Sequence, residues 1–119
     1  MVDVIKLVIA VRRDLDLGKG KIAAQAAHAA VSCALRAQKE DKRTFREWLD
    51  QGQKKIVVRV DNEKDLLDLM GKARLKGLIC EAVYDAGHTQ VDPGTLTCIG
   101  IGPASESALD ELTGEYSLL

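Results

Sequence analysis

Four short runs of mostly apolar residues predict four β-strands. The runs are residues 4–11, 55–60, 78–84 and 96–101. The first is apolar at nearly every position and rich in β-branched residues, which is typical of a central strand covered on both faces. Strong turn chemistry at 92–94 separates the last two runs, so we expect them to pair antiparallel. Gly102 and Pro103 predict the end of the fourth strand.

Apolar residues at helical spacing predict four helices between and after the strands. The expected helices are residues 20–39, 44–51, 63–76 and 105–112. The expected amino-terminal caps, in chain order, are Asp14 or Asp16, Thr44 in a capping box with Glu47, Asn62 and Ser105. This order of strands and helices is typical of parallel strands joined by right-handed crossovers. We therefore expect an α/β fold with helices on both faces of the sheet and an antiparallel last strand.

The composition is that of a soluble globular protein and predicts one domain, residues 1–119. Of the 119 residues 46% are hydrophobic and 29% charged, and no apolar run approaches the ~20 residues of a membrane span. The amino terminus lacks the pattern of a signal peptide, so we expect a cytoplasmic protein with no membrane partner. Cys33, Cys80 and Cys98 lie far apart in apolar segments. They are predicted to be buried free thiols, and we expect no metal site.

Charge is distributed unevenly along the chain. Residues 1–59 hold 13 Lys and Arg against 7 Asp and Glu, whereas residues 60–119 hold 4 against 11. This asymmetry fits a basic surface that meets a polyanion, and it equally fits charges scattered around a neutral molecule.

A glycine- and lysine-rich segment opens the longest predicted helix. Gly18, Lys19, Gly20 and Lys21 stand where a loop becomes a helix, and helix starts carry unpaired N–H groups with a partial positive charge. We expect a phosphate or a developing oxyanion to bind here.

Helical pitch places Gln25 and His28 on the same face as Lys21. His28 is two turns, about 10 Å, from Lys21. It fits a catalytic base or a core histidine bonded to a backbone carbonyl.

The expected topology brings a second set of polar residues to the same edge of the sheet. Sites of α/β folds gather at the carboxyl ends of parallel strands, where Lys21, Asp85, Thr89 and Thr97 are predicted to converge. A carboxylate can activate water, an ammonium can stabilise an oxyanion and hydroxyls can hold an ester. The alternative is structural, since an aspartate before Ala-Gly often bonds its own turn and threonines are common in strands.

Two other motifs suggest a nucleotide cofactor and base stacking, but their context argues against both. Residues 18–23 fit the dinucleotide pattern G-x-G-x-x-G/A, but six residues separate them from the preceding strand, and no Walker pattern is present. We therefore expect no nucleotide cofactor. Phe45 and Trp48 could stack on bases, but we interpret them as core or interface anchors.

Several motifs in order resemble one known family over nearly the whole chain. They are residues 12–15, 18–25, 28–31, 52–55, 85–90, 93–97 and 100–103. Together they resemble type II peptidyl-tRNA hydrolase, the form found in archaea and eukaryotes. The resemblance implies hydrolysis of the ester between a peptide and the 3′-terminal ribose of tRNA. It also implies a three-layer α/β/α sandwich with a mixed four-stranded sheet, no required cofactor and a homodimer.

The resemblance also implies roles for individual residues. The implied catalytic positions are Lys21, Asp85, Thr89, Thr97 and His28, and the implied substrate-binding positions are Gly18, Lys19, Gly20, Gln25, Gln90 and Arg12. His88 stands where related sequences often carry Lys or Arg. The basic residues expected to hold the tRNA backbone are Arg36, Lys39, Lys42, Arg43, Lys54 and Lys55. The competing readings are an RNA-binding or anion-binding adaptor without turnover and a protein-interaction domain that uses Phe45 and Trp48.

Overall fold

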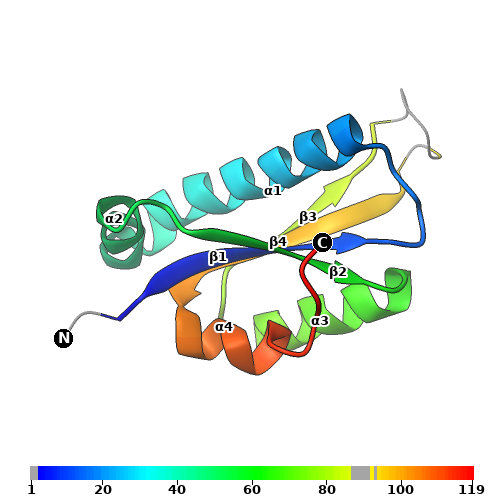
Figure 1. Cartoon of the computed structure of the whole chain (residues 1–119). Helices are drawn as coiled ribbons and strands as arrows, with labels where there is room; N and C mark the ends of the chain where they lie inside the picture. Colours follow the sequence, from blue (N-terminus) through cyan, green and yellow to red (C-terminus); the bar gives the residue numbers. More distant parts are fainter. Residues whose placement is uncertain (1–2, 87–91, 93) are drawn as a thin grey trace.

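A mixed four-stranded sheet forms the centre of the protein (Figure 1). The structure is a computed structural model, and it describes residues 3–86, 92 and 94–119. The strands are β1 (Ile5–Arg12), β2 (Lys55–Val60), β3 (Cys80–Tyr84) and β4 (Leu96–Ser105), in the order β2-β1-β4-β3. β1 pairs parallel with β2, and β4 pairs antiparallel with both β1 and β3. The predicted α/β class, with an antiparallel last strand, is confirmed.

Helices cover both faces of the sheet, as Figure 1 shows. They are α1 (Lys19–Glu40), α2 (Lys42–Asp50), α3 (Glu63–Leu75) and α4 (Glu106–Thr113). Alternation along β1 explains the three layers, because successive side chains of a strand point to opposite faces. Leu7 and Ile9 pack in the core beneath α1 and α2, whereas Val8 and Ala10 pack in the core against α3 and α4.

The fourth strand is longer than its sequence predicts. Gly102 and Pro103 were expected to end it, but β4 continues to Ser105, so this prediction was wrong. The register of β1 against β4 shifts between Lys6 and Val8, opposite this dipeptide. Proline has no backbone N–H and cannot donate a hydrogen bond to a neighbouring strand. It is tolerated here because the pairing of β1 and β4 is irregular at this point and does not require that hydrogen bond.

Two of the four predicted helix caps are confirmed. Asn62 and Ser105 cap α3 and α4 as expected. α1 begins after Gly18 without a side-chain cap, so neither Asp14 nor Asp16 caps it. Asp41 caps α2 by accepting a hydrogen bond from the N–H of Thr44, three residues on, and the predicted capping box between Thr44 and Glu47 is therefore wrong.

Buried side chains settle two further predictions. Cys33, Cys80 and Cys98 are free and buried, as expected. Trp48 is buried in the core beneath α1 and α2, where its indole N–H donates to the carbonyl of Lys54 at 3.0 Å. A ring held in this way is a core anchor and offers no face to a base. None of the described helices could span a membrane.

Candidate active site

Helix α1 lies close against β4 because Gly100 has no side chain. A Cβ added to Gly100 would lie 2.7 Å from Cys33 Sγ and 3.1 Å from the carbonyl oxygen of Ala29. Real Cβ atoms do not approach this closely, so only glycine permits this separation of helix and sheet. The close approach brings the first turns of α1 over the ends of β3 and β4.

Lys21 and Asp85 form an ion pair at this junction. The side chain of Asp85 has no exposed surface, and that of Lys21 is 15% exposed. The backbone of Asp85 is held as well, since its N–H donates to the carbonyl of Thr95 at 2.8 Å and its own carbonyl accepts from Gly94 at 2.9 Å. The two residues that were predicted to converge from distant parts of the sequence do lie together.

Gln25 and Thr97 form a buried hydrogen-bonded chain beside this pair. Gln25 Nε2 donates to Thr97 Oγ1 at 2.8 Å, and Thr97 Oγ1 donates to the carbonyl of Val83 at 3.1 Å. Val83 pairs with Cys98 but Tyr84 pairs with Leu96, so Thr97 falls at a register irregularity. Irregularities of this kind re-aim side chains beside functional sites. Thr97 therefore holds the helix to the sheet, and its contact with an ester stays a prediction.

His28 and the glycine-rich start of α1 are open to solvent. His28 is exposed, so the alternative of a core histidine is wrong. Lys19 and Gly20 are exposed in the first turn, after Gly18 in extended conformation. A Cβ at Gly20 would meet nothing within 4 Å, so packing does not require glycine there. The backbone of this turn is accessible to a ligand.

Arg12 makes contacts within the protein and is mostly buried. Its guanidinium donates to both carboxylate oxygens of Asp14 at 2.8 and 3.0 Å and to the carbonyl of Leu96 at 3.0 Å, and it pairs with Glu63. The hydrogen bond to Asp14 raises the pKa of Arg12, and the same bond lowers the pKa of Asp14. Arg12 thus ties the end of β1 to the start of β4, and its contact with substrate stays a prediction. The candidates Thr89 and Gln90 lie outside the described residues.

Comparison with known proteins shows the family of this chain. A family model described as peptidyl-tRNA hydrolase PTH2 matches residues 5–119. The chain belongs to this family. The peptidyl-tRNA hydrolase of Thermoplasma volcanium is 60% identical over 116 residues, which cover 98% of this chain and 99% of the relative. Those of Thermoplasma acidophilum and Methanocaldococcus jannaschii are 55% and 48% identical, each over 96% of this chain and 97% and 99% of the relative.

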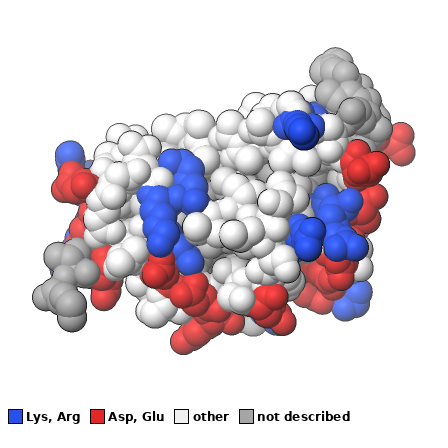
Figure 2. Space-filling model, in the orientation of Figure 1, with Lys and Arg blue, Asp and Glu red and all other residues white. Residues whose placement is uncertain are grey.

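Membership of the peptidyl-tRNA hydrolase PTH2 family draws attention to the basic surface. The residues predicted to hold RNA gather around the carboxyl end of α1, α2 and the start of β2. Arg36 lies fifteen positions after Lys21 in α1, which corresponds to about 22 Å along the helix axis. Figure 2 shows one group of positive residues near α2 and another near the carboxyl ends of β1 and β2, with uncharged surface between them.

Sequence reasoning missed two arginines in the second region, Arg13 and Arg59. Arg13 directly follows β1, and Arg59 lies in β2 between the buried Val58 and Val60. A charged residue flanked by buried valines in a strand indicates a position on the other face of the sheet. That pattern could have drawn attention to Arg59 before the structure was known.

Proposed function

We propose that this protein hydrolyses the ester between a peptide and the 3′-terminal ribose of tRNA, with Lys21 and Asp85 as the reacting pair. As a member of the PTH2 family the chain is a hydrolase of peptidyl-tRNA that releases tRNA. The observation that supports the residue assignment is the ion pair between a fully buried Asp85 and a partly exposed Lys21 at the amino end of α1.

The different exposure of the two side chains supports different tasks. The side chain of Lys21 retains some exposed surface and that of Asp85 has none, so in this proposal the ester carbonyl meets Lys21 first. Lys21 and the N–H groups of the first turn of α1, which have no partner within the helix, stabilise the oxyanion of the tetrahedral intermediate. The carboxylate of Asp85 holds the Lys21 ammonium in place, and the Asp85 side chain has no solvent-exposed surface.

Asp85 takes the proton of the attacking water in this scheme. The developing oxyanion draws the Lys21 ammonium toward itself, and Oδ1 of Asp85 exchanges its contact with Lys21 for the attacking water and acts as general base. The water oxygen forms a bond to the carbonyl carbon. The bond between that carbon and the ribose oxygen then breaks, and the proton passes to the ribose oxygen. The products are a peptide with a free carboxyl group and a tRNA with a free 3′-terminal hydroxyl.

Single-turnover cleavage of an N-blocked aminoacyl-tRNA tests the assignment. Lys21→Met and Asp85→Asn are each expected to slow release of the N-blocked amino acid by about 100-fold or more, because one oxyanion donor or the base is lost. The exposed pair Lys64 and Asp68 on α3 provides the matched controls, Lys64→Met and Asp68→Asn, which should retain the wild-type rate.

Stability must be measured beside activity. Removing one partner of a buried ion pair costs about 3–5 kcal/mol, so each variant is compared at a temperature where Trp48 fluorescence shows it to be folded. A folded Lys21→Met or Asp85→Asn variant with wild-type turnover would contradict the mechanism. Binding of the tRNA by the wild type without any release of the amino acid would favour the adaptor.

Two further parts of the proposal are a homodimer and a location in the cytoplasm. The exposed side chains of Val31 and Leu35 on α1, 58% and 59% accessible, offer apolar surface of the kind that a contact between subunits buries. Sedimentation equilibrium of the wild type should give twice the mass of the chain. A monomer at micromolar concentration would argue against the dimer.

A further inference from the structure

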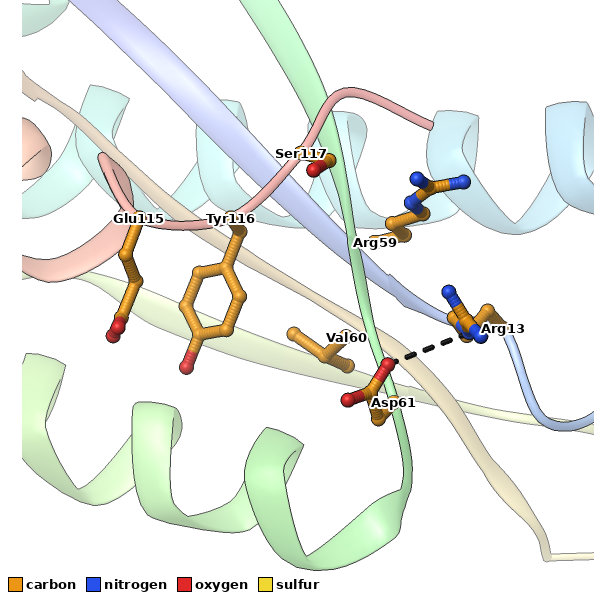
Figure 3. Close-up of a pocket in the computed structure, with 7 residues that line it drawn as sticks. All are labelled: Arg13, Arg59, Val60, Asp61, Glu115, Tyr116 and Ser117. Atoms are coloured by element: carbon orange, nitrogen blue, oxygen red, sulfur yellow. Dashed lines mark ion pairs between the residues drawn. The ribbon is translucent and has the colours of Figure 1, made fainter.

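Arg13 and Arg59 lie side by side at the carboxyl edge of the sheet. The N–H of Arg13 donates to the carbonyl of Val60 at 2.9 Å, which ties the end of β1 to the end of β2. Figure 3 shows both side chains extending to the same side of these strands. The parallel pairing of β1 and β2 thus places two guanidinium groups together that lie far apart in the sequence.

Little in the protein compensates these two charges. Arg59 is exposed, and its side chain has no ion-pair or hydrogen-bond partner among residues 3–86, 92 and 94–119. The Arg13 side chain is 56% exposed, and among the described residues its one ion pair is a 3.4 Å contact with the 71% exposed Asp61. Exposed pairs of this kind contribute little. Both guanidinium groups are therefore available to an anion, in contrast to the buried Arg12.

The surface is hollowed on both sides of these arginines, and the two hollows differ in charge. The one in Figure 3 also holds the carboxylates of Asp61 and Glu115. The other, about 230 Å³ in volume, is lined by Arg12, Arg13, Arg59 and Ile22 of α1, with Asp16 and the chain-terminal Leu119 also in its lining. Arg12 is already paired with Asp14 and Glu63. The positive groups of this hollow that remain available are therefore those of Arg13 and Arg59. An anion is favoured in the second hollow, beside the first turn of α1.

The register of the sheet relates this hollow to Asp85. The residue that pairs with Arg59 on β1 is Val11. Val11 pairs with Cys98 on β4, and Cys98 pairs with Val83 on β3, so these four residues form one row across the sheet. Three strand spacings of about 4.8 Å place Arg59 about 14 Å from Val83. Val83 lies two residues before Asp85. Stacked nucleotides advance about 3.4 Å per phosphate, so the hollow is about four nucleotides from the reacting pair.

We propose that Arg13 and Arg59 bind backbone phosphates of tRNA about four nucleotides from the ester. This inference rests on the proposed function of Lys21 and Asp85. Arginine forks match phosphate oxygens in a bidentate manner. The two arginines hold the 3′ strand at the carboxyl edge of the sheet, outside the buried row, so that its terminal ribose reaches Lys21 at the amino end of α1.

Two substrates separate this contact from the chemical step. N-blocked aminoacyl-tRNA carries the phosphates, and N-blocked aminoacyl-adenosine carries the same ester without them. Arg13→Gln and Arg59→Gln are each expected to raise KM for the tRNA about tenfold and to leave hydrolysis of the adenosine ester unchanged. The logarithm of tRNA affinity should fall less steeply with the logarithm of salt concentration, by about one unit of slope per arginine.

Control variants make the result specific. Arg74→Gln removes the same charge from the exposed last turn of α3, and it should leave both substrates and the salt slope unchanged. Asp61→Asn removes the carboxylate that competes for Arg13, and it should tighten tRNA binding. Equal loss on both substrates, or an unchanged salt slope in Arg59→Gln, would overturn the phosphate contact. Failure of the proposed function is distinct, because the wild type would then hydrolyse neither ester.

Discussion

Replacing Gly100 with alanine tests whether the close packing of α1 on β4 maintains both the fold and the site. The added Cβ would lie 2.7 Å from Cys33 Sγ and 3.1 Å from the Ala29 carbonyl. Carbon atoms pack best at about 3.5–4.0 Å, so α1 must withdraw by about 0.8 Å or more. Overpacking of this kind costs about 1–3 kcal/mol, and two close contacts place Gly100→Ala at about 2–3 kcal/mol.

Urea unfolding followed by Trp48 fluorescence measures this loss, since Trp48 is the single tryptophan and is buried. Gly71→Ala is the matched control. A Cβ there meets nothing within 4 Å, and alanine in the interior of α3 should add about 0.4–1 kcal/mol to the free energy of unfolding. Activity should fall in Gly100→Ala alone, because α1 carries Lys21, and displacement of a reacting group by about 1 Å can cost about 100-fold.

A double-mutant cycle identifies the clash. Cys33→Ala removes the sulfur that stands 2.7 Å from the added Cβ, so the double variant should be more stable than the sum of the single effects predicts. We expect a coupling of about 1 kcal/mol, which lies within the range for residues in contact. Additive effects, or a Gly100→Ala variant as stable as the wild type, would refute the packing argument.

Two other predictions concern buried polar groups. Thr97→Val should cost about 1–3 kcal/mol in urea unfolding because it leaves the Gln25 amide and the Val83 carbonyl without their partner, whereas Thr97→Ser should be close to wild type. Burial raises the pKa of Cys33 to about 12 and those of Cys80 and Cys98 to about 11, so a thiol reagent at pH 8 should modify none of the three in the native protein and all three in denaturant. Below about pH 9 these thiols should not change the free energy of unfolding. Between pH 9 and 12 the free energy of unfolding should fall, because the thiols ionise at lower pH in the unfolded chain than in the folded protein. Rapid native labelling, or stability that rises above pH 9, would contradict the burial.

The elements of this fold follow from short stretches of sequence. The apolar run of β1 is covered on both faces, and the caps Asn62 and Ser105 lie next to the helices that they begin. The meeting of Lys21 and Asp85 was also predictable, because strands of the same direction end at one edge of a sheet. In each case the cause is local, or is a general rule of strand order.

Only the tertiary structure decided how particular side chains are used. The sequence did not indicate that Arg12, predicted to bind substrate, is mostly buried against Asp14 and Leu96, or that Arg59 is exposed. Thr97 was predicted to hold the ester, and only the structure shows that Gln25 of α1 donates a hydrogen bond to its hydroxyl. The type of a residue determines which hydrogen bonds and ion pairs its side chain can form. Whether these interactions are made with another residue or with solvent depends on segments that come together only in the folded chain.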